Sequence, residues 1–323
     1  MGVLRNQFTN AMVKDLYAYF WENYDETPPM YQELFDVVSS TAAYEKFDSA
    51  IGLGELLEKP EGTDLQADSP MESYTIICKN RSFGRVIRFS KESVDDSQKG
   101  NLMQKTAGSW GRMVPYTKEL FYAKFFNYGA YTSGNSVFNN KITGVVDDPT
   151  GDLIYDSKAW FSTTHADKVG GSYANYVSSR ALTHPNLKTS YITYTSTNNR
   201  DERGNIVSLM PDTLLVPPAL YFTAREILES TLVPDIFDNT KNVLSAIVQP
   251  MAWQHITDTD GSGATGWYLG KKKMGLLATS RESVTIDFWQ EELSKDYFTS
   301  IFERYGGCVT NWRYWMAFNI STS

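Results

Sequence analysis

Two adjacent prolines, Pro217 and Pro218, constrain the fold of this chain more than any other feature. Proline lacks the amide hydrogen that strand and helix interiors use, so the pair ends a strand and is tolerated only in the first turn of a helix. The apolar run LLV precedes the pair and is typical of a buried strand. Apolar residues after the pair recur at the spacing of one helix face: Leu220, Ala224, Ile227 and Leu228. Residues 203–230 are therefore predicted to form a strand, a sharp turn and a helix.

A second stretch, residues 153–175, combines aromatic residues with a polar turn. The run AWF precedes STTHAD and a Gly-Gly break, a pattern typical of a strand that enters an ordered loop. Ser162, His165 and Asp167 supply the residue types of a hydrolase triad. Three neighbours in sequence cannot usually place nucleophile, base and orienting group in line, so we expect His165 to form local hydrogen bonds instead.

Composition indicates a folded chain that is not a nucleic-acid reader. Hydrophobic residues make up 41% of the 323 residues and charged residues 21%, close to ordinary globular proteins. The net charge is -8, whereas binding to a phosphate backbone needs clustered Lys and Arg. No phosphate-binding GK(S/T) motif occurs. The high aromatic content of 14% suits both large cores and protein interfaces.

The two cysteines, Cys78 and Cys308, are far apart and lack the spacing of a zinc site or a disulfide framework. We expect them to be reduced and to act as small apolar packing residues. No apolar run reaches the ~18 residues of a membrane span, and residues 1–10 lack the apolar centre of a signal peptide. The sequence predicts a protein made in a reducing cytoplasm and, since it starts at Met1, one without removal of a long N-terminal segment.

Residues 47–90 alternate between extended segments and turn residues. Tyr74, Ile76 and Cys78 alternate with the residues at 75, 77 and 79, and a second set shares one face: Phe83, Arg85, Ile87 and Phe89. The pattern predicts the strands of a long hairpin. Because an isolated ribbon of two strands is marginally stable in water, we expect this one to rest on another chain.

Several further elements follow from periodicity. Residues 13–24 form a short aromatic helix, which can pack either on a neighbouring subunit or on its own domain. Asp95 and Asp96 open a helix that runs to about Asn127, with a kink at Pro115. The remaining predictions are a helix and polar strand over 181–198, a strand over 242–249, a hairpin over 266–281 and a half-buried strand over 308–320.

Taken in order, these motifs resemble the major head proteins of tailed bacteriophages, of the Mu-like branch. The segments that carry the resemblance are KPEG at 59–62, ESY at 72–74, SKE at 90–92, FSTTH with the following GG and N at 161–175, LLVPPAL at 214–220, and FERYGGCVTNWR at 302–313. Two positions depart from the family pattern: Ser73 stands where glycine is common and Asn311 where aspartate is common.

The resemblance implies an α+β fold of the Hong Kong 97 type. Its expected parts are an N-terminal arm at 1–46, an extended E-loop at 47–92, a peripheral domain at 93–180 with a long spine helix at about 95–127, an axial domain at 181–299, and a C-terminal strand at 300–323 that returns to the peripheral domain.

The resemblance also implies a function. It predicts a major capsid protein without enzymatic activity or cofactor, which assembles in the bacterial cytoplasm into the pentamers and hexamers of an icosahedral virion. The expected partners are other copies of the chain, a portal, and scaffold, cement or decoration proteins. The shell encloses double-stranded DNA without sequence-specific binding, and no membrane is involved. The alternatives are a phage sheath or tube component and a cytoplasmic hydrolase.

Two sets of residues are expected to contact neighbouring subunits. The E-loop set is Glu61, Tyr74, Phe83, Arg85 and Arg88, and the axial set near the capsomer centre is Asp258, Asp260, Lys271 and Lys272. The run around Asp258 is similar to a calcium loop, but Leu269 stands where such a loop needs a bidentate glutamate. We therefore expect a solvated turn there and no metal.

Overall fold

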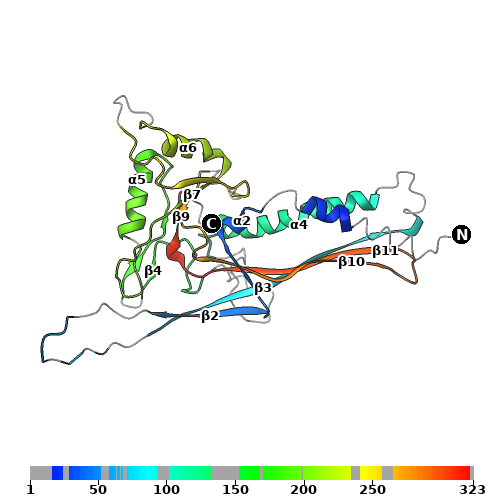
Figure 1. The fold of residues 1–323 in the computed structure, drawn as a ribbon, viewed down its shortest axis with the longest axis horizontal. Helices are drawn as coiled ribbons and strands as arrows, with labels where there is room; N and C mark the ends of the chain where they lie inside the picture. Colours follow the sequence, from blue (N-terminus) through cyan, green and yellow to red (C-terminus); the bar gives the residue numbers. More distant parts are fainter. Residues whose placement is uncertain are drawn as a thin grey trace.

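The computed structural model describes residues 17–24, 29–51, 58–62, 64–65, 67, 71–92, 102–132, 153–167, 170–197, 199–233, 241–256 and 265–320. Two five-stranded sheets dominate the molecule. One sheet is long and narrow and carries a helix along its length, and the other lies in a body with two shorter helices (Figure 1). A ribbon of two strands extends from the long sheet beneath the body, and residues 58–62, which lie between these strands in sequence, are placed beyond the body.

The long sheet has the strand order β1-β10-β11-β3-β2. Its strands are β1 (Asp36–Ser39), β2 (Tyr44–Ile51), β3 (Met71–Phe89), β10 (Leu276–Gln290) and β11 (Tyr297–Val309). Strand β3 pairs with β2 through its first half and with β11 through its second half, both antiparallel. The two strands predicted around Tyr74–Cys78 and Phe83–Phe89 do not pair with each other, because residues 71–89 form one strand of 19 residues. The hairpin of this region is instead the antiparallel pair of β2 with β3.

Helix α4 (Leu102–Asn127) packs on one face of the long sheet and confirms the predicted long helix from Leu102 onward; it continues through Pro115. The predicted start at Asp95 and Asp96 lies outside the described residues. The ring of Phe121 meets the rings of Phe83 and Tyr305 at centroid distances of 5.6 and 5.3 Å. Residues 17–24 are helical, and Phe20 is buried with Trp110 of α4. The short helix therefore packs on its own chain through this ring, while the predicted residues 13–16 lie outside the described residues.

The body is built on the second sheet, with strand order β6-β12-β9-β7-β8. Its strands are β6 (Tyr176–Val177), β7 (Thr213–Val216), β8 (Gln249–Ala252), β9 (Trp267–Gly270) and β12 (Trp315–Phe318). Helices α5 (His184–Ile192) and α6 (Tyr221–Glu229) belong to the same body, as do the short strands β4 (His165–Ala166) and β5 (Ser172–Tyr173). The strand, proline pair and helix predicted around Pro217 are confirmed as β7, a turn of 3₁₀ helix and α6.

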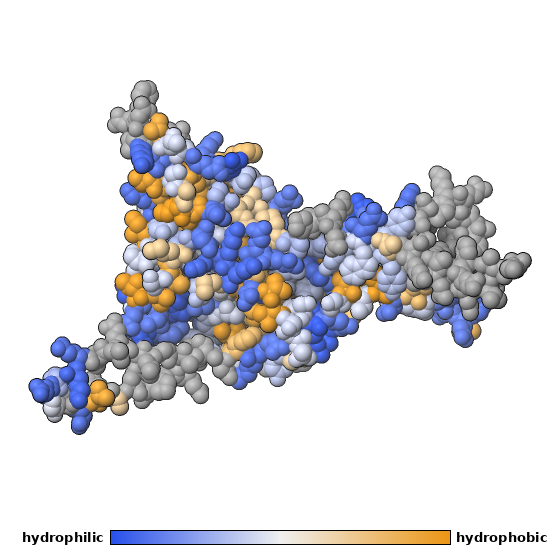
Figure 2. Space-filling view, in the orientation of Figure 1, coloured by the Kyte–Doolittle hydropathy of each residue, from blue (hydrophilic) through white to orange (hydrophobic). Residues whose placement is uncertain are grey.

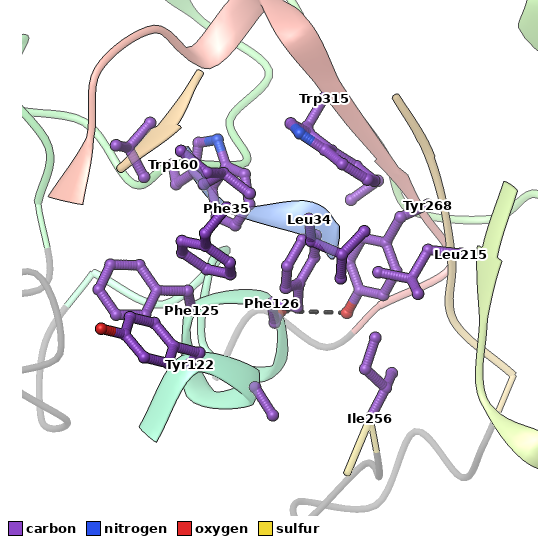
Figure 3. Close-up of a cluster of buried hydrophobic side chains, with 14 of the residues drawn as sticks. Leu34, Phe35, Tyr122, Phe125, Phe126, Trp160, Leu215, Ile256, Tyr268 and Trp315 are labelled. Carbon is purple, nitrogen blue, oxygen red and sulfur yellow. Dashed lines mark hydrogen bonds between the residues drawn. The ribbon is translucent and has the colours of Figure 1, made fainter. Parts of the chain in front are cut away.

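One aromatic core joins the long sheet and its helix α4 to the body. Phe126, in the last turn of α4, contacts the rings of Trp160, Trp253, Tyr268 and Trp315 at centroid distances of 5.0 to 6.0 Å. The hydroxyl of Tyr268 donates a hydrogen bond of 3.0 Å to the carbonyl of Phe126 (Figure 3). Because large rings from both sheets share this cluster, the end of α4 is held against the body.

Four predicted elements are wrong in detail. The strand expected over 308–320 is interrupted, because Oδ1 of Asn311 accepts the amide of Arg313 and starts a 3₁₀ turn at Trp312–Tyr314. The chain then enters the other sheet as β12. The hairpin expected over 266–281 is absent for the same reason, since β9 and β10 belong to different sheets. Between them Gly275 takes the positive φ of 78° that the turn requires.

The other two errors concern polar segments. Residues 243–248 form turns rather than a strand, because the side chain of Asn242 bonds to the amide of Leu244 and to the carbonyl of Ile227. The polar strand expected after α5 is a π-helical turn, Thr193–Thr197. Its hydroxyl groups donate to carbonyls one turn earlier, as Ser196 does to Ile192.

Candidate inter-subunit surface

The ribbon formed by β2 and β3 has little support from its own chain. Each residue of its described tip, 58–62, is exposed, and the tip lies at the far end of the projection (Figure 1). Glu61 is in this tip. Among the described residues, burial on the same chain occurs at the root of the ribbon, where Ile76 and Cys78 are buried and the ring of Tyr74 meets that of Tyr155 at 5.4 Å.

The other predicted E-loop residues lie on the part of β3 that pairs with β11. Phe83 stacks on Tyr305 at 4.2 Å and so contributes to the core of its own subunit. Arg85 is exposed. Arg88 donates from Nε to Oδ2 of Asp296 over 2.7 Å, and this hydrogen bond lowers the pKa of Asp296. Within the E-loop set, Glu61 and Arg85 are therefore the residues most available for contact with another chain.

The long sheet has open edges. Strand β1 pairs with β10 only from Leu277 to Ser280, so the remainder of β10 has no neighbour on that side among the described strands. Strand β2 forms the other edge. Val37 on β1 and Phe47 on β2 are 45% and 39% exposed. Open edges with apolar side chains are templates for association unless another chain covers them.

Apolar side chains also reach the surface at the distal end of the long sheet. Trp289 stacks on Phe298 at 5.5 Å and is 43% exposed, and Val86 on the adjacent strand is 54% exposed. Leu293, in the turn between β10 and β11, is 94% exposed. In Figure 2, hydrophobic residues appear at the surface both along the long sheet with its helix α4 and on the body. Exposed apolar surface of this kind is typical of sites that contact other proteins.

The total accessible area, like the individual exposed residues, indicates that the subunit contacts other proteins. The accessible area is 18465 Å² for a chain of 36.6 kDa. A compact monomer of this mass exposes roughly 13,500 Å². The excess of roughly 5,000 Å² is large enough to supply several specific interfaces, each of which takes about 800 Å² from one partner. An accessible area of this size is typical of a subunit of a larger assembly rather than of a compact monomer.

The loop that suggested a hydrolase triad is a structural junction. His165 is fully buried, with Nδ1 2.5 Å from Oδ2 of Asp156 and Nε2 3.1 Å from Oδ1 of Asn175. Its ring stacks on Trp312 at 4.2 Å. The amide of Asn175 donates to the carbonyls of Trp160, Trp312 and Trp315. These contacts tie residues 153–175 to the C-terminal segment.

The other members of the suggested triad point to different partners. The hydroxyl of Ser162 accepts the amide of Thr164, and Oδ1 of Asp167 accepts the amide of Gly171. Sequence reasoning predicted the local bonding of His165 but missed Asp156 and the stacking on Trp312. Within the part of the chain that the structure describes, no cluster of His, Cys, Asp and Glu has the makings of a metal site.

The predicted axial residues are only partly visible. Asp258 and Asp260 lie outside the described residues. Lys271 and Lys272 lie at the passage from β9 to β10, where the amide of Lys272 donates to Oδ1 of Asp212 and its Nζ lies 3.4 Å from Oε2 of Glu33. The contacts of Lys272 are therefore within its own chain.

None of the described helices combines the length and hydrophobicity needed to span a bilayer. Two buried carboxylates belong to the long sheet and its helix: Glu119 on α4 and Glu303 on β11. Burial raises the pKa of Glu119 even though its side chain accepts hydrogen bonds from Tyr31 and Trp253. Burial likewise raises the pKa of Glu303, although Nζ of Lys118 lies 2.7 Å from its Oε2.

An extended ribbon, a long helix on a narrow sheet and a separate body together define a viral shell subunit, and comparison with known proteins supports this class. Residues 75–320 match the family model described as phage capsid protein. The chain therefore belongs to the phage capsid protein family and is a structural protein rather than an enzyme. No curated protein matches the chain.

Solved structures of capsids show the same fold. The capsid protein of cyanophage P-SCSP1u is 12% identical, with a TM-score of 0.57 over 92% of this chain and 89% of that one. The capsid protein of the empty GTA particle is 14% identical, with a TM-score of 0.53 over 89% and 88%. That of the Myoviridae phage XM1 is 11% identical, with a TM-score of 0.51 over 90% and 91%. The fold is of the Hong Kong 97 type, as expected from the sequence, while the Mu-like branch stays a prediction.

Proposed function

We propose that this major capsid protein assembles with copies of itself into pentamers and hexamers that close an icosahedral phage head around double-stranded DNA. The observation that carries the proposal is the excess accessible area, together with a ribbon whose tip is exposed throughout. Membership of the capsid family and the fold shared with three capsid proteins support it.

In this proposal the ribbon lies across the neighbouring subunit, where Glu61 meets the partner. Arg85, on the half of β3 that pairs with β11, is a second contact away from the ribbon tip. Tyr74 contributes by fixing the root of the ribbon to its own subunit, and Phe83 and Arg88 by fixing the half of β3 that pairs with β11, since each has a partner within the chain. The peripheral domain includes residues 276–309, because β10 and β11 share the sheet of β3. The axial domain is the body that carries α5 and α6.

The proposed shell is assembled in the bacterial cytoplasm and becomes part of the virion. A net charge of -8 makes the subunit a poor ligand for phosphates, which suits a container that encloses DNA without reading its sequence. A closed head also needs a portal, and scaffold or decoration proteins are further partners in this proposal.

Electron microscopy of the purified full-length protein tests the function. We expect closed shells, whereas tubes would favour a sheath or tube component and dispersed monomers at high concentration would contradict the proposal. The contact of the ribbon is tested by Glu61→Arg, which reverses a charge at an exposed tip and should lower the assembled fraction several-fold without changing the melting temperature of the unassembled subunit. Glu226→Arg, on the exposed side of α6, is the control for a change in net charge.

A further inference from the structure

The fold brings the two cysteines of the chain together. Gly306 of β11 pairs with Asn80 of β3, and two residues further along these antiparallel strands stand Cys308 and Cys78. The thiol of Cys308 is in hydrogen-bond contact with that of Cys78. Both thiols are free, and both side chains are almost completely buried, with exposed fractions of 1% and 0%. Residues separated by most of the sequence thus lie side by side, just beyond the last pair of the β3–β11 ladder.

The position suits a disulfide. Residues that face each other in an antiparallel pair have Cα atoms about 4.5–5.5 Å apart, within the ~4.4–6.8 Å that a disulfide spans. The surroundings are apolar, since the cluster around the two sulfurs consists of Ile76, Leu277 and the ring of Tyr155.

We propose that Cys78 and Cys308 are a latent intrachain disulfide, which forms when the folded protein meets a peroxide oxidant. One thiol is first oxidised by hydrogen peroxide to a sulfenic acid with release of one water molecule. The second thiol then attacks the sulfenic sulfur, forms the S–S bond and releases a second water molecule. The overall reaction consumes two thiols and one peroxide and gives one disulfide and two water molecules.

The buried position makes the reaction slow in the closed sheet. Burial, with the neighbouring Cys78 adding to it, raises the pKa of the Cys308 thiol well above its ordinary value. Since the thiolate is the reactive form, the pair stays reduced in a cell and reacts when the sheet opens locally or the oxidant persists. Phage particles pass from a reducing cytoplasm to an oxidising exterior. That the cysteine pair meets oxidising conditions in this way rests on the proposed function.

The bond would lie at the root of the ribbon. Cys78 is also opposite Glu45 of β2, so a link to Cys308 fixes the point at which β3 leaves its pairing with β11 and continues with β2. The closed loop would contain every described strand of the body except β12, which follows Cys308 in the chain. Closing a loop of this length restricts the unfolded chain strongly and should raise the melting temperature of the oxidised subunit by on the order of 5 °C.

The test uses full-length native protein, before and after incubation with hydrogen peroxide. Each sample is denatured in iodoacetamide, digested with trypsin and analysed by mass spectrometry. We expect the peptides that contain Cys78 and Cys308 to become joined, with loss of both alkylated forms and restoration by dithiothreitol. Cys78→Ala and Cys308→Ala serve as controls that cannot form the bond and should show no rise in melting temperature after oxidation.

Three results would overturn the inference. The first is that both thiols are still alkylated by iodoacetamide after prolonged oxidation. The second is the formation of sulfinic or sulfonic acids without a joined peptide. The third is a joined peptide that arises only from chains that migrate as a linked dimer on a non-reducing gel. The joined peptide is measured in the wild-type chain, so a variant that fails to fold leaves the conclusion unaffected. Because the bond is within one chain, the result is independent of whether shells form.

Discussion

The indole Nε1 of Trp253 donates a hydrogen bond of 2.6 Å to Oε2 of Glu119. The other carboxylate oxygen accepts the amide of Tyr31 over 3.1 Å, at the start of α2 (Tyr31–Leu34). One buried side chain of α4 therefore joins the N-terminal segment to the end of β8 in the body. This contact sits beside the aromatic core of Figure 3 and explains why an acidic residue is retained where the surroundings are apolar.

The substitution Glu119→Gln should destabilise the subunit by about 1–3 kcal/mol, because an amide keeps one acceptor oxygen and leaves either Trp253 or Tyr31 unsatisfied. Urea unfolding of the unassembled subunit measures the change. Glu226→Gln, on the exposed face of α6, is the matched control and should change the stability by less than about 0.5 kcal/mol. Equal effects of the two substitutions would contradict the bridging role of Glu119.

The same carboxyl group predicts a pH dependence. Burial raises the pKa of Glu119 in the folded subunit, so the folded state favours the neutral form. Its contribution to stability is present at pH values below the unfolded pKa and is lost as the pH rises through the raised folded pKa. We expect Glu119→Gln to remove this part of the decline in unfolding free energy above about pH 4.5. A decline of unchanged size in the variant would assign the effect to another group, of which Glu303 is the first candidate.

Asn175 should be among the polar residues least tolerant of substitution. Its amide donates to the carbonyls of Trp160, Trp312 and Trp315, while its oxygen accepts the amide of Ser162 over 2.8 Å. Asn175→Ala leaves several buried backbone groups without this partner and should cost about 2–4 kcal/mol, measured by urea unfolding. Asn186→Ala, which removes an exposed bond to the carbonyl of Ala181, should cost under about 1 kcal/mol.

Two glycines of the chain predict opposite outcomes. A Cβ added at Gly270 would lie 2.3 Å from the ring of the fully buried Trp315, so Gly270→Ala should destabilise the subunit by about 1–3 kcal/mol or prevent folding. A Cβ added at Gly108, inside α4, meets only the side-chain end of Asn23 at 3.2 Å. Gly108→Ala should stabilise the helix by up to about 1 kcal/mol. Thermal unfolding of the two variants gives the signs directly, and stabilisation by Gly270→Ala would refute the close packing of β9 on β12.

Local patterns were sufficient to predict the elements whose signals are contiguous in sequence. The strand and helix on either side of Pro217 and the long helix α4 are examples, because proline geometry and helical periodicity act over a few residues. The order of motifs also led to the Hong Kong 97-type fold. The contact of Cys78 with Cys308 was not predictable, because it depends on the pairing of β3 with β11, which no local pattern specifies.

The sequence patterns also did not predict the two places where the chain crosses from one sheet to the other. Residues 266–281 and 308–320 have continuous strand-like composition, yet each segment leaves one sheet and enters the other. The local signals are single residues, Gly275 with its positive φ and Asn311 with its side-chain cap, and such signals are common in loops of every kind. Similarly, the role of Asn175 depends on three carbonyls from distant tryptophans, so its importance became visible only with the tertiary structure.

Assembly should depend on salt because every subunit carries the same net charge of -8. Repulsion between like-charged copies acts over a distance of about 10 Å at ~0.1 M salt and weakens as the salt concentration rises. Apolar contacts through residues such as Val37, Phe47 and Trp289 are not weakened in this way. We therefore expect the assembled fraction of purified subunits, measured by light scattering, to increase between low salt and about 0.1–0.3 M salt. Assembly that is strongest at very low salt would show that attraction between opposite charges, including those of Glu61 and Arg85, outweighs the repulsion between whole subunits.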